Sequence, residues 1–353
     1  MVGLSIGLNL GVPFNLLSTD LERYQSITNI MTTIVTQQLP NQADTLSSSE
    51  NDPIVVVCAA DDNYAMPLAV TLRSALENLG DKRKLSIFII DGGIATGNKR
   101  KIAISLQSDK VANLIWLHPS ENSITDVEAS SYYTKAIFYR LLIPELLPEY
   151  PKAIYLDSDV VVNADLGNLW DVDIGDNYLL AARDLYFPTI LSTPCKKFFQ
   201  SKVLKIDKFF NSGVLSINLE KWRLEKIGIE VIKCISQHKL LDQEGLNVVL
   251  KDKWKEIDPR WNRTSGIYEC NSWKNSPFPE DEFTNLVNHP YIIHFTSADK
   301  PWNSINRCPE QPLFYNYLDM TAWAGWRFTQ WKRIQRRLNQ AANRIWQKIS
   351  LIK

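Results

Sequence analysis

The chain has 353 residues, 45% of them hydrophobic, and its 39 basic residues balance its 39 acidic ones. This is the composition of a globular protein with a substantial core. No uninterrupted apolar run approaches the roughly 18 residues of a membrane span, and the five scattered cysteines form no Cys-x-x-Cys pair of the zinc-binding kind. We therefore expect a cytoplasmic protein with one large domain.

The sequence predicts three regions. Residues 18–52 are rich in Ser, Thr, Gln, Asn and Asp, so residues 1–52 are expected to form a flexible N-terminal extension. The folded domain is expected at 53–305, followed by a C-terminal region at 306–353. The last 27 residues contain eight lysines or arginines and no acidic residue, which leaves the remainder net acidic.

Strands and helices are predicted to alternate from residue 54 onward. The apolar run 54–60 is typical of a strand buried on both faces. Periodic apolar residues then predict a helix that has Pro67 in its first turn and ends at Gly80. A strand at 85–90, a helix near 97–108, a strand at 113–117 and a helix at about 132–147 follow. This order predicts an α/β fold, doubly wound around a mostly parallel sheet, with its site at the carboxyl ends of the strands.

The most informative segment is the apolar strand that leads into Asp157-Ser158-Asp159. In an extended chain alternate side chains share a face, so both carboxylates should point to one side. Carboxylates with open positions suit Mg²⁺ or Mn²⁺ held together with substrate phosphates. Asp171 and Asp173 have the same spacing, but they lie in a polar stretch that reads as an ordinary loop.

The turn after the first strand, Ala60-Asp61-Asp62-Asn63, should meet the paired carboxylates at one edge of the sheet, in a crevice of nucleotide size. It has no glycine-rich loop, so neither a dinucleotide fingerprint nor a P-loop is present. A bound metal would have to neutralise the phosphates.

Other polar residues follow apolar runs, and each allows an ordinary structural reading as well. Gly213, two residues after Asn211, fits either a close backbone approach to a ligand or a simple turn. Asp242 opens a helix and could be only its N-cap. His294, at the end of an apolar strand, is the best histidine ligand candidate, although such a residue is often part of a core.

Two basic residues complete the candidate site. Lys300 could donate to a phosphate oxygen or lie in solvent. Arg140 lies on a largely apolar helix and needs an anion there, either an acidic side chain or a phosphate.

In this order the motifs resemble glycosyltransferase family 8, the retaining, nucleotide-sugar-dependent galactosyl- and glucosyltransferases that include lipopolysaccharide enzymes and the glycogenins. The resemblance runs from about Ile54 to Trp302. It rests on the following segments: Ala60-Asp61-Asp62-Asn63-Tyr64, Tyr155-Leu-Asp157-Ser-Asp159, Asp184, Phe210-Asn211-Ser-Gly213-Val, Leu219-Glu-Lys-Trp222-Arg223, Asp242-Gln243-Glu244 and His294-Phe-Thr-Ser-Ala-Asp-Lys300-Pro-Trp302.

The resemblance implies a single GT-A-type, Rossmann-like catalytic domain and a UDP-sugar donor, UDP-glucose or UDP-galactose, with Mn²⁺ or Mg²⁺ as cofactor. The metal would be ligated by Asp157, Asp159 and His294. The nucleotide would contact Ala60, Asp61, Asn63 and Ser158, with Lys300 on the diphosphate beside Ser297, where relatives often have glycine. The donor sugar would face Arg140, Asp184, Asn211, Asp242 and Gln243.

The family relation also implies transfer with retention to a glycan or glycolipid acceptor. An amide is a poor nucleophile, so we favour front-face substitution in which Gln243 and Asn211 stabilise an oxocarbenium-like transition state. Residues 185–208 and 262–288 are the loops in which acceptor contacts are expected.

From Trp331 onward, apolar residues recur every three or four positions among lysines and arginines, which predicts a basic amphipathic helix. Such a helix can lie on an anionic membrane, here the inner face, or pack on its own domain. No fold for nucleic-acid binding is indicated.

Two alternative functions stay open. A metal-dependent nucleotidyltransferase would need a glycine-rich basic loop that this chain lacks. A degenerate, membrane-associated sugar-nucleotide-binding protein would have no reason to keep the whole predicted site.

Overall fold

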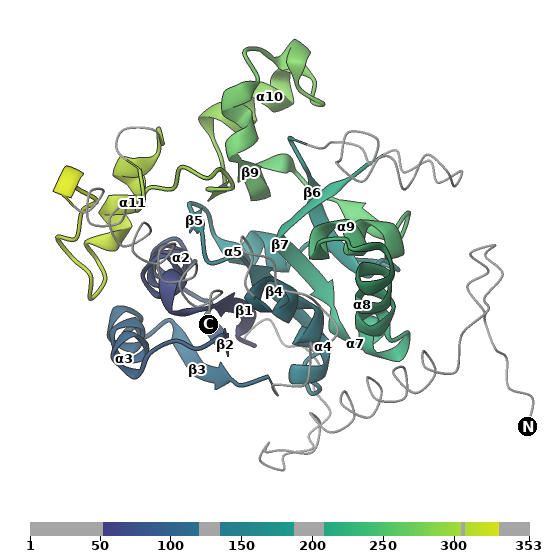
Figure 1. Cartoon of the computed structure of the whole chain (residues 1–353), viewed down its shortest axis with the longest axis horizontal. Helices are drawn as coiled ribbons and strands as arrows, with labels where there is room; N and C mark the ends of the chain where they lie inside the picture. The colour runs from purple at the N-terminus through teal and green to yellow at the C-terminus, as the bar shows by residue number, and fades with distance from the viewer. Residues whose placement is uncertain (1–51, 120–134, 187–207, 305–307, 332–353) are drawn as a thin grey trace, which may run out of the picture.

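The computed structural model describes residues 52–119, 135–186, 208–304 and 308–331. Its centre is a seven-stranded sheet with the order β3-β2-β1-β4-β7-β6-β8 (Figure 1). Only β7 runs antiparallel to its neighbours, β4 and β6. The strands are β1 Ile54–Ala60, β2 Leu85–Asp91, β3 Val111–Leu117, β4 Lys152–Leu156, β6 Leu179–Arg183, β7 Phe210–Asn218 and β8 Trp254–Glu256. The predicted α/β class and the mostly parallel sheet are confirmed.

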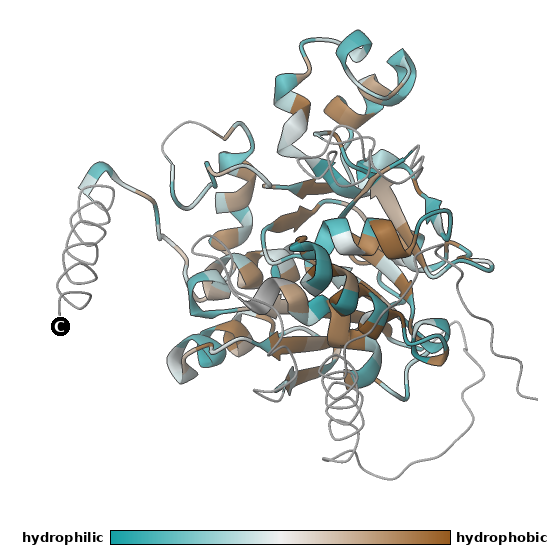
Figure 2. Cartoon of the chain, turned by 45° about the vertical axis from the view of Figure 1, so that its right-hand side comes forward, coloured by the Kyte–Doolittle hydropathy of each residue, from teal (hydrophilic) through white to brown (hydrophobic). Residues whose placement is uncertain are grey.

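The sheet separates two hydrophobic cores, and β1 shows why its sequence is apolar throughout. Val55 and Val57 contribute to the core on one face, whereas Ile54, Val56 and Cys58 contribute to the core on the other. All seven residues of the strand are buried. Figure 2 shows the apolar residues concentrated in these central strands. A strand that is buried on both faces needs apolar residues at every position, which is the pattern read from the sequence.

Helices cover both faces of the sheet. One core includes residues of α2 Ala65–Glu77, α3 Thr96–Ser105 and α5 Leu166–Trp170. The other includes residues of α4 Ile143–Leu146, α7 Leu219–Leu224, α8 Ile227–His238 and α9 Asp242–Val249. The helices predicted near 67–79 and 97–108 are confirmed.

The helix predicted at about 132–147 is present from residue 135, where the described residues begin, but most of it is not α-helical. The structure has a 3-10 helix, η2, over Lys135–Leu142, followed by the short α-helix α4 with Pro144 in its first turn. Proline has no N–H to bond the carbonyl of Arg140, and its ring would clash with that carbonyl in a continuous α-helix. The chain therefore restarts its helix at Ile143.

A smaller sheet stands beside the central one and joins the C-terminal part to it. Its order is β5-β10-β9, formed by Val160–Val162, Ile292–His294 and Arg263–Thr264. Helix α11, Gln311–Leu318, packs with this sheet and α2 around a third core that includes Val70, Val161 and Phe314. Helix α10, Glu280–Asn288, lies farther out (Figure 1). No helix among the described residues is long and apolar enough to span a bilayer.

Candidate metal and donor site

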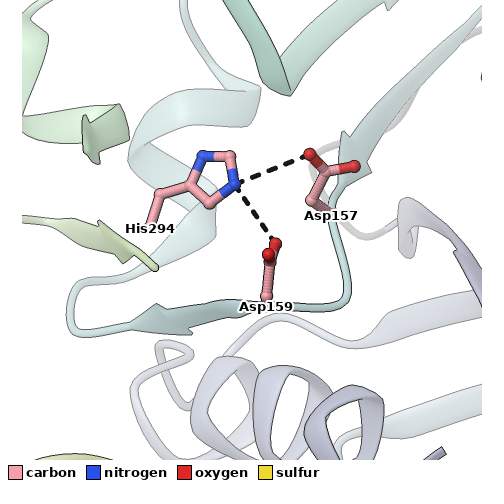
Figure 3. Close-up of side chains that lie close together, drawn as sticks. All are labelled: Asp157, Asp159 and His294. Carbon is pink, nitrogen blue, oxygen red and sulfur yellow. Dashed lines mark ion pairs between the residues drawn. The ribbon is translucent and has the colours of Figure 1, made fainter. Parts of the chain in front are cut away.

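Asp157, Asp159 and His294 converge where the two sheets meet (Figure 3). His294 Nε2 lies 3.1 Å from Asp159 Oδ1 and 3.6 Å from Asp157 Oδ2. One ligand atom from each residue lies within 4.8 Å of the others. Strand pairing produces this arrangement, because His294 ends β10 and pairs there with Val160, the first residue of β5.

The backbone at the two aspartates differs from the prediction. They were expected to lie on one strand, but β4 ends at Leu156 and β5 begins at Val160, so both aspartates lie in the connection between two sheets. The N–H of Asp157 still donates to the Gly213 carbonyl beside β4 (2.8 Å), while the Asp159 carbonyl accepts from Phe295 N (3.0 Å) next to β10. The chain thus changes sheets between the two carboxylates, and both face His294.

The three side chains fit a divalent cation. Two carboxylate oxygens and an imidazole nitrogen suit Mn²⁺ and are compatible with Mg²⁺. Lys300 Nζ also bonds Asp159 Oδ2, at 2.7 Å. Burial alone would raise the pKa of Asp159, but the ion pair with Lys300 and the contact with His294 hold that pKa well below its usual range. These two neighbours therefore maintain the buried carboxylate as an anion, as a metal ligand must be.

Gly213 on β7 leaves the space that these ligands occupy. A Cβ atom there would lie 2.1 Å from His294 Cε1 and 2.7 Å from Asp157 Oδ2. The close approach at Gly213 is therefore to side chains of the protein itself, and the approach to a bound ligand stays a prediction. Asp157 is fixed further by the Tyr155 hydroxyl, which donates to its Oδ1 at 2.7 Å.

Arg140 is buried and binds anions of the protein. Its Nη2 donates to Asp157 Oδ1 at 2.9 Å, and its Nε lies 3.0 Å from Asp242 Oδ2. Burial and the negative charge of Asp157 raise the pKa of Asp242, and Arg140 opposes that rise. Asp242 is the first residue of α9 after the N-cap Leu241, whose N–H donates to Glu244 Oε2 (2.8 Å). The N-cap reading of Asp242 is therefore wrong.

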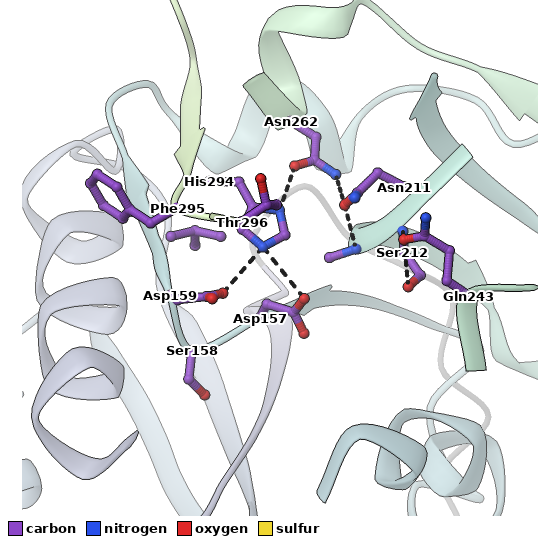
Figure 4. Close-up of polar contacts among 12 residues, drawn as sticks. Asp157, Ser158, Asp159, Asn211, Ser212, Gln243, Asn262, His294, Phe295 and Thr296 are labelled. Carbon is purple, nitrogen blue, oxygen red and sulfur yellow. Dashed lines mark hydrogen bonds and ion pairs between the residues drawn. The ribbon is translucent and has the colours of Figure 1, made fainter. Parts of the chain in front are cut away.

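A second group of polar side chains lies next to Asp157, Asp159 and His294 (Figure 4). Asn211 Nδ2 and Gln243 Nε2 both donate to Asp184 Oδ2, at 2.9 and 3.1 Å. Gln243 Oε1 accepts from Ser212 N at 3.0 Å. Three of the predicted sugar-facing residues thus form one network, although they come from β7, α9 and the end of β6.

The residues predicted to bind the nucleotide lie mainly at the carboxyl end of β1. Ala60 ends that strand, and Asp61 Oδ1 accepts from the N–H groups of Asn63 and Tyr64 at 3.0 and 3.3 Å. Ser158 Oγ donates to the Ala59 carbonyl at 2.7 Å, which ties the Asp-Ser-Asp connection to β1.

Ser297 lies in the loop that leads to Lys300, and its Oγ donates to the Asp299 carbonyl at 2.9 Å. The roles of Ser297 and of the β1 residues toward a nucleotide stay predictions.

Asn262 was not among the predicted site residues, but the structure places it at the centre of the site. Its Nδ2 donates to Asn211 Oδ1 at 2.8 Å, and its Oδ1 lies 2.9 Å from His294 Nδ1. Residues 262–288 were expected to contact the acceptor. The side chain of Asn262 bridges the network of Asp184, Asn211 and Gln243 and the cluster of Asp157, Asp159 and His294, while acceptor contacts of this segment stay a prediction.

A doubly wound sheet with paired carboxylates and a histidine at its edge is the arrangement of a GT-A-type glycosyltransferase. The model of glycosyl transferase family 8 matches residues 55–306, and the chain belongs to that family. The resemblance read from the motifs is confirmed.

Individual relatives agree with this assignment. The chain is similar to general stress protein A of Bacillus subtilis, with 32% identity over 276 residues that cover 76% of this chain and 94% of the relative. The lipopolysaccharide 1,2-glucosyltransferase of Escherichia coli is 24% identical, over 78% of this chain and 80% of that protein. Among solved structures, galactosyltransferase LgtC in complex with donor and acceptor sugar analogues has a TM-score of 0.66 and 27% identity, over 76% of this chain and 96% of LgtC.

Proposed function

We propose that this glycosyltransferase moves glucose or galactose from a UDP-sugar to a glycan or glycolipid acceptor, with retention at the anomeric carbon and with Mn²⁺ or Mg²⁺ as cofactor. The observation that carries the proposal is the convergence of Asp157, Asp159 and His294 beside Lys300. Two hard oxygen ligands and one imidazole, next to the positive charge of Lys300, suit a divalent cation that holds the diphosphate of a nucleotide sugar.

The leaving group requires stabilisation, because a diphosphate departs with negative charge. When bound to Asp157, Asp159 and His294, a divalent cation supplies Lewis-acid stabilisation of that charge. Lys300 now donates to Asp159 and to the Phe295 carbonyl. Once Asp159 is neutralised by another partner, Lys300 is released to donate to a diphosphate oxygen.

The hydrogen bonding of the acidic residues favours front-face substitution. Asp184 accepts from two side-chain amides and from Tyr186 N, and Asp242 is paired with Arg140, so neither carboxylate is free to attack C1. In the front-face reaction the bond from C1 to the phosphate oxygen breaks. The acceptor oxygen bonds C1 on the same face and passes its proton to the leaving diphosphate. Gln243 and Asn211 would stabilise the positive charge that develops on the sugar.

The acceptor class is proposed from the relatives. LgtC was solved with donor and acceptor sugar analogues, and the Escherichia coli relative is a lipopolysaccharide glucosyltransferase. Both fit a glycan or glycolipid acceptor. The basic helix that would hold the enzyme at the inner face of a membrane lies outside the described residues, apart from Trp331, and stays a prediction.

The test is donor hydrolysis and transfer by purified protein with a panel of UDP-sugars and Mn²⁺, followed by product analysis. We expect hydrolysis of UDP-glucose or UDP-galactose, its loss in excess chelator, and a product with the anomeric configuration of the donor. Full activity in excess chelator would refute the role of the metal. UDP binding without turnover would instead support the degenerate sugar-nucleotide-binding protein.

A matched pair of variants sharpens the test. Asp157→Asn changes a proposed metal ligand and should lower turnover by at least about 100-fold. Asp171→Asn is the control, because Asp171 belongs to a second Asp-x-Asp segment whose carboxylate binds Arg83 at the surface, at 2.8 Å. Its turnover should stay within about two-fold of the unmodified protein. Equal losses in both variants would contradict the assignment of Asp157.

A further inference from the structure

His294 binds a buried asparagine through the ring nitrogen that faces away from the two carboxylates. His294 Nδ1 lies 2.9 Å from Asn262 Oδ1, and only 4% of His294 and 2% of Asn262 are exposed. Strand pairing fixes the contact, because Asn262 directly precedes β9 and β9 pairs in parallel with β10 through Arg263 and Ile293. Figure 4 shows Asn262 between His294 and Asn211.

The hydrogen-bond direction in this row of side chains is set by two groups that cannot reverse their roles. The Asp184 carboxylate only accepts, so the group of Asn211 that faces it, at 2.9 Å, must be the NH₂ donor. The N–H of Gly213 only donates, so the Asn211 atom that faces it, at 3.0 Å, must be the oxygen. The amide of Asn211 therefore has one orientation, independent of how its oxygen and nitrogen were assigned.

That orientation determines the next two links. Asn262 faces Asn211 Oδ1 at 2.8 Å, so it must present its NH₂ group there and its oxygen to His294. An amide oxygen only accepts, so His294 Nδ1 must carry a hydrogen. In the neutral imidazole the lone pair then lies on Nε2, the nitrogen that faces Asp157 and Asp159.

We propose that Asn262 is a positioning residue that holds His294 in the Nδ1–H tautomer, so that Nε2 stays available as a ligand. This inference rests on the proposed metal-dependent function and adds to it a residue that touches neither metal nor donor. Without Asn262, the favourable tautomer places the hydrogen on Nε2, where it can be donated to Asp159 Oδ1 at 3.1 Å. That hydrogen would occupy the nitrogen needed for coordination.

The test compares two substitutions that differ in whether an acceptor for Nδ1–H is kept. Asn262→Leu removes the acceptor for Nδ1–H, whereas Asn262→Asp keeps an acceptor in the same place. Asn78→Leu is the control for loss of hydrogen bonds elsewhere, because Asn78 Nδ2 donates to the Ser74 and Val162 carbonyls at 3.0 Å, away from the site. The tautomer is read from ¹⁵N–¹H spectra of the full chain labelled on histidine, at alkaline pH, with His294 assigned through His294→Gln.

We expect the Nδ1–H form in the unmodified protein, in Asn262→Asp and in Asn78→Leu, and the Nε2–H form or a mixture in Asn262→Leu. Calorimetry should show Mn²⁺ affinity lower by about 10- to 100-fold in Asn262→Leu and unchanged in Asn78→Leu. An Nδ1–H tautomer that persists in Asn262→Leu would overturn the proposal. If Asn262→Leu does not fold, loss of the Nδ1–H form in Asn262→Asp would overturn it instead.

The tautomer measurement needs neither metal nor donor, so its result is separate from the proposed function. Suppose that Asn262→Leu loses the tautomer preference and that excess chelator does not change the turnover of the unmodified protein. This result would refute only the metal-dependent reaction. A persistent Nδ1–H form together with metal-dependent turnover would refute only the role of Asn262.

Discussion

Gly213→Ala should disable the ligand cluster without changing any ligand. The added Cβ would stand 2.1 Å from His294 Cε1, whereas ordinary contact begins at 3.4 Å. His294 or β7 would have to move by about 1.3 Å, several times the ~0.2 Å tolerance of a metal–ligand distance. Loss of one ligand in three should weaken Mn²⁺ binding by about 100-fold, or roughly 2.7 kcal/mol. Alanine itself is tolerated by the backbone, because Gly213 is not among the residues with positive φ.

Calorimetry with Mn²⁺ and UDP measures this loss, and thermal unfolding of the same samples separates it from general instability. Two glycines provide controls. A Cβ at Gly97 meets nothing within 4 Å, so Gly97→Ala should be neutral. A Cβ at Gly80 would lie 2.6 Å from Asp165 Oδ2, so Gly80→Ala reports the cost of crowding away from the site. Unmodified Mn²⁺ affinity in a folded Gly213→Ala variant would refute the steric argument and the ligand role of His294.

Three other substitutions test the energetics of the site and its surroundings. Burial raises the pKa of Glu145 to about 7, and its Oε2 has no hydrogen-bond partner among the described residues. The folded state then binds the proton more tightly than the unfolded state, so stability falls as pH rises through 7. Glu145→Gln should remove this fall, so its free energy of unfolding in urea should be about 3 kcal/mol higher than that of the unmodified protein at about pH 8, with no difference near pH 4. Gln243→Ala should lower the transfer rate by at least about 100-fold with unchanged Mn²⁺ affinity. A loss of only a few-fold would show that Gln243 does not stabilise the transition state. Arg140→Ala leaves Asp157 and Asp242 without their guanidinium partner and should cost about 3–5 kcal/mol in the same denaturation assay, whereas a cost below 1 kcal/mol would mean that water replaces it.

The fold could be predicted where burial alone dictates the residue type. A strand such as β1, buried on both faces, requires apolar side chains throughout, and α2 requires an apolar stripe. The connection from Asp157 to Asp159 could not be predicted, because the chain there leaves one sheet for another. That change depends on hydrogen-bond partners from β7 and the end of β10, which lie far away in the sequence.

In the site, too, residues marked by a local sequence pattern could be predicted, and a residue placed by long-range pairing could not. Asp157 and Asp159 are close in sequence, so the pattern revealed them, and the position of His294 at the end of an apolar strand made it a candidate that the family motif then supported. Asn262 has no local signal, because its role arises only when β9 pairs with β10.

The charges of the site explain why its two cations have different roles. Three carboxylates, Asp157, Asp159 and Asp242, face the permanent charges of Arg140 and Lys300. Arg140 is buried and binds two of these carboxylates at once, so releasing it would leave both without a counter-charge. Lys300 binds only one of these carboxylates, Asp159, and also the Phe295 carbonyl, so a cation on Asp159 could replace it without leaving a second carboxylate unpaired. In the proposed function, a cation bound at Asp159 would supply positive charge to the donor diphosphate and would free Lys300 to donate to it as well.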